Sequence, residues 1–306
     1  MREVLIEDFK QLTERNIPWD ELRDKTFLIT GATGLVGSLL VRCLLYANET
    51  INLNAKVYAV VRNTDKADRI FEDEKTDALS YIVADLATEK VCCEGECDYI
   101  IHAAAVTASK LMVSDPVGTI RTSIDGTEKM LQLAVEKKVR AFIYISSMEI
   151  YGQPKTEGKT AEKDLGYVDI ETVRSCYPEG KRMCECMCTA YAAQYGVNVI
   201  SARLAQTFGA GILPTENRVF AQFARSAVNG ENIVLHTTGE SEGNYVYTAD
   251  AIAAILTLLV KGAAGESYNI ANEGSHITIR NMAQLVADEI AGGKIQVVID
   301  IPEDSA

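Results

Sequence analysis

The chain has 306 residues, of which 47% are apolar and 24% charged, and its formal net charge is −13. This is the composition of an ordinary globular protein with room for one or two domains. The negative charge argues against nucleic acid or an anionic membrane as a partner, and no apolar run reaches the length of a membrane span. The N-terminus lacks the layout of a signal peptide, so we expect a cytoplasmic protein.

The eight cysteines do not indicate a disulfide framework in a chain of this length without an export signal. Six of them form two groups, Cys92, Cys93 and Cys97 in the first and Cys184, Cys186 and Cys188 in the second. Neither group has the Cys-x-x-Cys spacing of a zinc site, and on a helix Cys186 would point away from its two neighbours. We therefore predict no metal site and expect mostly small buried thiols.

The chain begins with a predicted amphipathic helix over residues 2–16, followed by a short connection to the first strand. The apolar residues that share one face of this helix are Val4, Leu5, Phe9 and Leu12. Residues 1–24 are thus predicted to form an N-terminal helical extension.

A glycine-rich turn follows the first strand, residues 27–30, and precedes an apolar helical run that starts at Leu35. The turn reads Gly31-Ala-Thr-Gly-Leu-Val-Gly37. A strand that turns on glycine into a helix directs free backbone N–H groups and the positive end of the helix dipole at one point, which suits a pyrophosphate. The first gap between its glycines is one residue longer than in the common dinucleotide fingerprint. The alternative to a pyrophosphate site is a tight strand-to-helix turn of the kind found in any α/β protein.

Apolar strands then alternate with helices. The predicted strands are 56–61, 80–84, 99–101 and 141–146, with a long helix over 116–138 before the last of them. Strands that are apolar throughout and alternate with helices predict a doubly wound parallel sheet, Rossmann-like, with ligands at the carboxyl ends of its strands. Arg62, Asp85 and His102 fall at such ends.

The second half of the chain is less regular. Residues 152–176 form a predicted irregular loop, which in a compact protein indicates function. The later predicted elements are a helix at 177–195, a strand at 197–202, a helix at 219–228, strands at 233–235 and 245–247, and helices at 249–260 and 278–290. We expect a dinucleotide-binding domain over 25–203 and a small mixed substrate-binding lobe over 204–306, interleaved with it.

A tyrosine and a lysine lie four residues apart on one predicted helix face, at Tyr177 and Lys181. A nearby ammonium group favours the phenolate, so the tyrosine pKa should fall toward that of a working base. Ser146 and Ser147 end the fifth strand, where a hydroxyl could bind the same substrate oxygen.

Together these motifs resemble the extended short-chain dehydrogenase/reductase superfamily, in the branch that modifies nucleotide sugars. The matching motifs are Gly31–Gly37, Asp85-Leu86, His102-Ala-Ala104, Ser146-Ser-Met-Glu-Ile-Tyr-Gly152 and Tyr177-x-x-x-Lys181. The resemblance covers residues 25–300, and the run Arg174-Ser-Cys-Tyr-Pro-Glu-Gly-Lys-Arg182 is most similar to UDP-glucuronate decarboxylases.

The resemblance implies a redox-neutral reaction through a 4-keto sugar. In it Tyr177 is the catalytic base, Lys181 holds the nicotinamide ribose and lowers the tyrosine pKa, and Ser147 binds the reacting hydroxyl. Glu149 matches the acidic residue of the decarboxylase and dehydratase groups. The alternative interpretation of Glu149 is a solvated carboxylate at a strand end. Thr107 and Gln206 are further expected substrate contacts.

The resemblance also implies a set of cofactor contacts. These are Gly31, Thr33, Gly34, Leu35, Val36, Gly37, Arg62, Asn63, Asp85, Leu86, His102, Ala103, Ala104, Tyr177 and Lys181. The nearest families bind NAD, whereas Arg62 could pair with the 2′-phosphate of NADP or stack on the adenine, so NAD and NADP both stay open. Asp85 is the expected contact to the adenine amino group.

Several positions depart from the pattern. Met148 stands where 4,6-dehydratases carry an acidic residue, which disfavours dehydration. Gly243-Asn244 replaces an expected arginine, and Arg218 either substitutes for it or is a solvated charge at a helix start. The chain ends at Ala306, short of the C-terminal segment of these families, so we expect a truncated chain or a shortened member.

The first hypothesis is therefore a nucleotide-sugar enzyme of the decarboxylase type. The alternatives are a 4-epimerase or 4,6-dehydratase, an NADPH-dependent ketone reductase, and a cofactor-binding protein without catalysis. A homodimer is expected through a four-helix contact of the helices at 116–138 and 177–195. Its proposed interface residues are Met130, Leu133, Met183 and Met187, which could instead be ordinary core.

Overall fold

A computed structural model describes residues 2–154, 158–213 and 216–301 of the chain. The chain divides into two compact units, one of Met1–Ala205 with Thr248–Ile270 and one of Gln206–Tyr247 with Ala271–Ala306. Residues 302–306, which include the chain end noted above, lie outside the described residues. No helix within the described ranges is long and apolar enough to cross a membrane.

A seven-stranded parallel sheet forms the centre of the first unit, in the order β10-β6-β5-β4-β1-β2-β3. The strands are β1 (Thr26–Thr30), β2 (Lys56–Val61), β3 (Leu79–Val83), β4 (Tyr99–His102), β5 (Ala141–Ser147), β6 (Val199–Leu204) and β10 (Ser267–Ile270). The order reverses between β1 and β4, which is where ligands bind in such sheets. The predicted doubly wound fold is confirmed.

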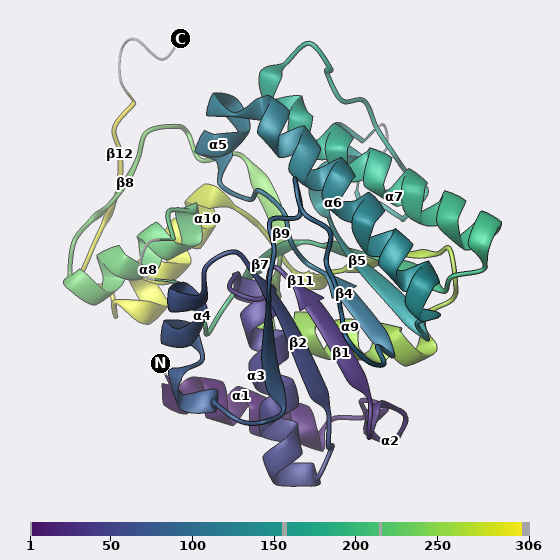
Figure 1. Cartoon of the computed structure of the whole chain (residues 1–306). Helices are drawn as coiled ribbons and strands as arrows, with labels where there is room; N and C mark the ends of the chain where they lie inside the picture. Colours follow the sequence, from purple (N-terminus) through teal and green to yellow (C-terminus); the bar gives the residue numbers. More distant parts are fainter. Residues whose placement is uncertain (1, 155–157, 214–215, 302–306) are drawn as a thin grey trace. The chain divides into compact units, whose positions relative to one another are not determined.

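Helices cover both faces of this sheet (Figure 1). The described helices of the first unit are α1 (Arg2–Glu14), α2 (Trp19–Leu22), α3 (Leu35–Ile51), α4 (Thr64–Ile70), α5 (Ser109–Ser114), α6 (Pro116–Lys137), α7 (Cys176–Tyr195) and α9 (Thr248–Lys261), with 3-10 turns η1 (Glu72–Glu74), η2 (Met148–Tyr151) and η3 (Val173–Ser175). Helices α3 and α9 contact each other over one face, and α6 and α7 pack together on the other.

Local sequence explains where the long helix α6 begins and where the long helix α7 ends. Asp115 caps α6 by accepting a hydrogen bond from Gly118 N at 3.1 Å, and Pro116 occupies the first turn, where a missing N–H costs nothing. Helix α7 ends at Gly196, whose φ of 68° is left-handed.

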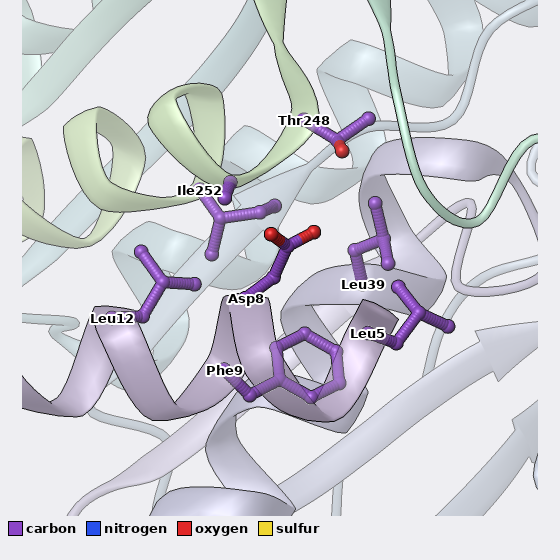
Figure 2. A pocket seen from close by; sticks show the side chains of 8 residues that line it. Leu5, Asp8, Phe9, Leu12, Leu39, Thr248 and Ile252 are labelled. Atoms are coloured by element: carbon purple, nitrogen blue, oxygen red, sulfur yellow. The ribbon is translucent and has the colours of Figure 1, made fainter. Parts of the chain in front are cut away.

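The N-terminal helix α1 packs against α3 and α9 through Leu5, Phe9 and Leu12, which are buried. Val4 is 48% exposed, so its predicted place on the buried face is wrong. Val4 lies about 100° around the helix axis from Leu5, outside the buried face. Asp8 lies on that face between Leu5 and Leu12 and is buried with them. Figure 2 shows the Asp8 carboxyl group in a small pocket that it shares with Thr248, the first residue of α9.

The described part of the second unit contains two small sheets and two α-helices. One sheet has the order β11-β9-β7, with β7 (Gln206–Phe208) parallel and β11 (Asn272–Thr278) antiparallel to β9 (Glu242–Tyr247). The other pairs β8 (Ile233–Leu235) with β12 (Val297–Ile299). The remaining elements are α8 (Val219–Asn229), α10 (Ile279–Leu285) and a π-helical turn η4 (Val286–Ile290).

Candidate active site

The turn between β1 and α3 comes so close to the end of β4 that only glycine fits. Gly31 has a φ of 63°, and a Cβ there would lie 2.8 Å from the backbone of Ala103 and Ala104. A Cβ on Gly37 would overlap the Gly31 carbonyl group. The glycines thus join the ends of β1 and β4 at the point where the strand order reverses.

The start of α3 offers free donors to an anion. Gly34 precedes the helix without a side chain to cap it, and the first helical N–H groups, from Leu35 to Gly37, have no intrahelical acceptor. Thr33 is half-buried in the turn beside them. The donor set and the glycine cradle fit the pyrophosphate of a dinucleotide, which the helix dipole also favours.

His102 ends β4 in a hydrogen-bonded network. Its Nδ1 lies 2.7 Å from Thr30 Oγ1, which also accepts from Ala104 N at 3.1 Å, and its Nε2 lies 3.2 Å from Thr127 Oγ1. The Thr127 hydroxyl donates to Cys184 Sγ, so it must accept from Nε2, and Nδ1 accepts from Thr30. Burial lowers the pKa of His102 to about 3, and the charge of Lys181 adds to this, so the ring is neutral.

Lys181 lies in α7, one turn after Tyr177, and is 3% exposed. Its Nζ donates to the carbonyl oxygen of Ile145 at 2.7 Å and lies 5.8 Å from the centre of the Tyr177 ring. Burial lowers the pKa of Lys181 to about 8, while Cys184, Glu185 and Cys188 raise it. The lysine is therefore still mostly an ammonium ion at neutral pH.

Tyr177 is buried at the start of α7, in a small apolar cluster with Met112 and Cys176. The Cys176 thiol donates to Met112 O at 3.3 Å, which ties the start of α7 to α5. The predicted pair of Tyr177 and Lys181 thus lies together at the carboxyl end of β5, the strand that ends in Ser147.

Ser147 and Glu149 follow directly from that strand. Ser147 Oγ accepts from Glu149 N at 3.2 Å and so begins η2. The Glu149 carboxylate is held by both terminal nitrogens of Arg174, at 2.6 and 3.1 Å. This bidentate pair raises the pKa of Arg174 and fixes the plane of the carboxylate. Glu149 is therefore oriented by a partner rather than simply solvated.

The ends of β2 and β3 carry the other predicted cofactor contacts. Arg62 and Asn63 are exposed, and the Asn63 side chain accepts from Lys66 N at 2.7 Å as the cap of α4. Asp85 Oδ1 accepts from Ala87 N at 2.9 Å in a turn, next to the buried Leu86. The amide oxygen of Asn63 is thus already engaged, whereas no ion pair is seen for Arg62 among the described residues.

The predicted substrate contacts are divided between the two units. Thr107 is exposed in the loop before α5. Gln206 and Arg218 belong to the second unit, where Gln206 begins β7 opposite Tyr245 of β9. Arg218 pairs with Glu216 at 2.8 Å and lies 4.9 Å from the centre of the Phe220 ring, so its charge has a local partner.

A buried ion pair behind the site was not predicted from the sequence. Arg203 of β6 contacts Glu185 of α7 at 2.6 Å and also donates to Tyr151 and to the Glu162 carbonyl group. Tyr151 in turn donates to Asn269 of β10 at 2.6 Å. The cluster ties part of the irregular loop to the sheet edge, and only the unusual charge within the strand Val199–Leu204 hinted at it.

Two predicted interface residues, Met130 and Leu133, lie in the core between the sheet and α7, so assigning them to a dimer contact is wrong. Met183 is 50% exposed, and Met187 is partly buried against the same core. All eight cysteines are free, and Cys186 is exposed while Cys184 and Cys188 are buried, as the helical spacing predicts.

Comparison with known proteins assigns the family. The model of the "NAD dependent epimerase/dehydratase family" matches residues 27–271. UDP-glucuronic acid decarboxylase 6 of Arabidopsis thaliana is 31% identical over 286 residues, which cover 90% of this chain and 78% of that protein. UDP-glucuronic acid decarboxylase 1 of Xenopus tropicalis is 28% identical over 92% of this chain and 64% of its own length. The chain thus spans slightly less than two thirds of that relative.

Solved structures share the fold. UDP-glucose 4-epimerase of Thermotoga maritima superposes with a TM-score of 0.75 at 22% identity, covering 92% of this chain and 87% of that one. A dTDP-glucose 4,6-dehydratase of Streptomyces venezuelae gives a TM-score of 0.71 at 24% identity, covering 90% and 84%. The extent of the family match, together with the Arabidopsis relative, shows that the chain belongs to the NAD dependent epimerase/dehydratase family.

Proposed function

We propose that this protein is a nucleotide-sugar enzyme that works without net oxidation, through a 4-keto sugar, and that it decarboxylates a UDP-glucuronate-like substrate. The observation that carries the proposal is the buried Lys181 ammonium group beside Tyr177 at the carboxyl end of β5. The similarity to UDP-glucuronic acid decarboxylases supports the choice of substrate class.

The positions of the residues support the following roles. Tyr177 takes the proton of the sugar 4-hydroxyl, and the positive charge of Lys181 favours the phenolate that does so. Ser147, at the end of the same strand that Lys181 contacts, binds that hydroxyl. A bound nicotinamide would accept the hydrogen of the sugar C4 as hydride and return it later. In the ketone state a carboxyl group at C5 is that of a β-keto acid and leaves as carbon dioxide.

Glu149 and Arg174 form the part of the site that faces the sugar in this proposal. Arg174 is 41% exposed and Glu149 31% exposed, so the pair is open to a ligand while the two salt-bridge contacts fix its geometry. A carboxylate held in this way accepts hydrogen bonds from sugar hydroxyls, and the N–H groups of Arg174 that the pair leaves over can donate to an anionic substrate.

The cofactor of the family is NAD, and Arg62 raises the question of NADP. The exposed guanidinium at the end of β2 supports a contact with a 2′-phosphate in this proposal, and the Asn63 side chain is occupied in capping α4. Mass spectrometry of the cofactor released from denatured protein distinguishes the two. If NADP is used, Arg62→Ala should weaken NADP binding at least about tenfold and leave NAD binding unchanged, because one charge-assisted contact is lost.

The reaction is tested with a panel of nucleotide sugars and mass analysis of the products. Loss of carbon dioxide supports decarboxylation, loss of water supports dehydration, and an isomer of equal mass supports 4-epimerisation. Met148 at the start of η2 offers no acid for dehydration. Net consumption of NADPH would instead indicate a ketone reductase, and no turnover of any sugar would indicate a binding protein.

Tyr177→Phe removes only the phenolic oxygen and should abolish turnover while leaving cofactor binding intact. Tyr195→Phe is the matched control, because Tyr195 lies 52% exposed at the other end of the same helix. Equal activity of the Tyr177→Phe variant and the parent protein would refute the assignment of the base.

We also propose a homodimer through the exposed faces of α6 and α7, which carry Val117, Ile120 and Met183. Exposed apolar side chains on neighbouring helices support a helix-to-helix contact between copies. Sedimentation at micromolar concentration measures the mass, and a monomer at all concentrations would contradict this.

A further inference from the structure

We propose that Tyr144 is a positioning residue that holds the Lys181 ammonium group in its charged form through the face of its ring. The proposal rests on the function proposed above for Tyr177 and Lys181, and it adds a residue that none of the sequence motifs includes. Tyr144 lies in the middle of β5, three residues before Ser147, and is 1% exposed.

The geometry is that of a cation over an aromatic ring. Lys181 Nζ lies 4.7 Å from the centre of the Tyr144 ring, well inside the distance of about 6 Å at which such contacts act. The same nitrogen is 5.8 Å from the centre of the Tyr177 ring and donates to Ile145 O at 2.7 Å. Tyr144 is thus the nearer of the two rings, and it belongs to the strand whose carbonyl group fixes the ammonium ion.

Among the described residues, no carboxylate forms an ion pair with Lys181. The nearest acidic residue on α7, Glu185, is bound to Arg203 at 2.6, 3.0 and 3.2 Å. From α7 the lysine otherwise faces the Cys184 and Cys188 thiols, and from β4 the His102 ring, which is neutral. A buried ammonium ion without a carboxylate partner depends on dipoles and ring faces to keep its proton.

The hydroxyl group of Tyr144 contributes little to this position. It is buried and has no hydrogen-bond partner within the described residues. Burial raises the pKa of Tyr144 well above its usual value, so the phenol stays neutral. The ring therefore serves as an uncharged aromatic surface between His102, whose ring centre is 5.9 Å away, and Lys181.

If Tyr144 only fills space, then any side chain of similar volume should leave the lysine unchanged. If its ring face stabilises the cation, the proton affinity of Lys181 should follow the electron density of the ring. Fluorination of a phenylalanine at this position removes that density stepwise while it keeps the shape, so it separates the two explanations without opening a cavity.

The test measures the Lys181 titration directly in the full chain. Lysine labelled with ¹³C at Cε is observed by NMR across pH, and the Lys181 signal is assigned by its loss in Lys181→Met. We expect Tyr144→Phe to titrate like the parent protein. A phenylalanine with two and then three ring fluorines at position 144 should lower the Lys181 pKa in steps, by about one unit in total, a tenfold change in proton affinity.

Tyr144→Leu should lower the Lys181 pKa by a similar amount, and thermal unfolding followed by circular dichroism shows whether that variant is folded. An unchanged Lys181 pKa across the fluorinated series would overturn the proposal, as would an equal effect of Tyr144→Phe and Tyr144→Leu. The result does not depend on turnover, so failure here is distinct from failure of the proposed function, which Tyr177→Phe tests.

Discussion

Mild acid should destabilise this protein through His102 more than through any surface histidine. The imidazole is 1% exposed, and burial lowers its pKa to about 3 from a usual value of about 6.5. The folded chain therefore binds this proton far more weakly than the unfolded chain does. The stability that depends on the neutral ring is fully present above about pH 6.5 and is lost as the pH falls toward 3.

The size of the effect follows from the two pKa values. At pH 5 the ring is almost fully protonated in the unfolded chain and almost neutral in the folded chain. The difference in proton binding then costs about 2 kcal/mol of unfolding free energy, and the limit at still lower pH is about 5 kcal/mol. The hydrogen bonds to Thr30 and Thr127 hold the neutral tautomer, so protonation also breaks the acceptor role of Nδ1.

Urea unfolding near neutral pH and near pH 5 measures this loss in the parent protein and in His102→Gln. The variant removes the titrating ring, so the parent should lose about 2 kcal/mol more than the variant between the two conditions. His236→Gln, at an exposed position, controls for the removal of a histidine. An equal acid loss in His102→Gln and the parent would refute the reasoning, and so would a ¹H NMR titration of the His102 ring between pH 5 and 8.

Two further pairs of variants test the packing around the site. Gly37→Ala should weaken cofactor binding by at least about tenfold, because its Cβ would overlap the Gly31 carbonyl group. Gly180→Ala in α7 meets only ordinary contacts, so its free energy of unfolding in urea should rise by up to about 1 kcal/mol. Arg203→Met removes the ion-pair partner of the largely buried Glu185 and should cost about 3–5 kcal/mol of unfolding free energy. Arg15→Met breaks an exposed pair and should cost less than about 1 kcal/mol. Similar losses for Arg203→Met and Arg15→Met in urea unfolding would contradict this.

The central sheet could be predicted because its signals are local. Most strands of the sheet interior are short apolar runs, with Arg203 in β6 as the exception, and the edge strand β10 was not predicted. The glycine turn after β1 has a spacing that few other structures need. The missed elements are short, such as α4 with seven residues and β7 with three, and their periodicity is too brief to detect. The place of Val4 could not be predicted, since the width of a buried helix face depends on what packs against it.

The site was predictable in its motifs and not in its partners. Tyr177 and Lys181 are one helical turn apart, so their proximity follows from the sequence. Arg174 is 25 residues from Glu149 along the chain, and Tyr144 is likewise far from Lys181 in sequence. Contacts across such separations depend on how α7 packs on β5, which no local pattern encodes.

The charge of Lys181 and the neutrality of its surroundings depend on each other. A carboxylate beside the lysine would hold its proton more firmly, but it would also cancel the field that favours the phenolate proposed for Tyr177. The fold avoids this by engaging Glu185 with Arg203 and by keeping His102 neutral between two hydroxyl groups. The remaining positive charge lies 5.8 Å from the centre of the Tyr177 ring, and burial of this cation lowers its pKa to about 8.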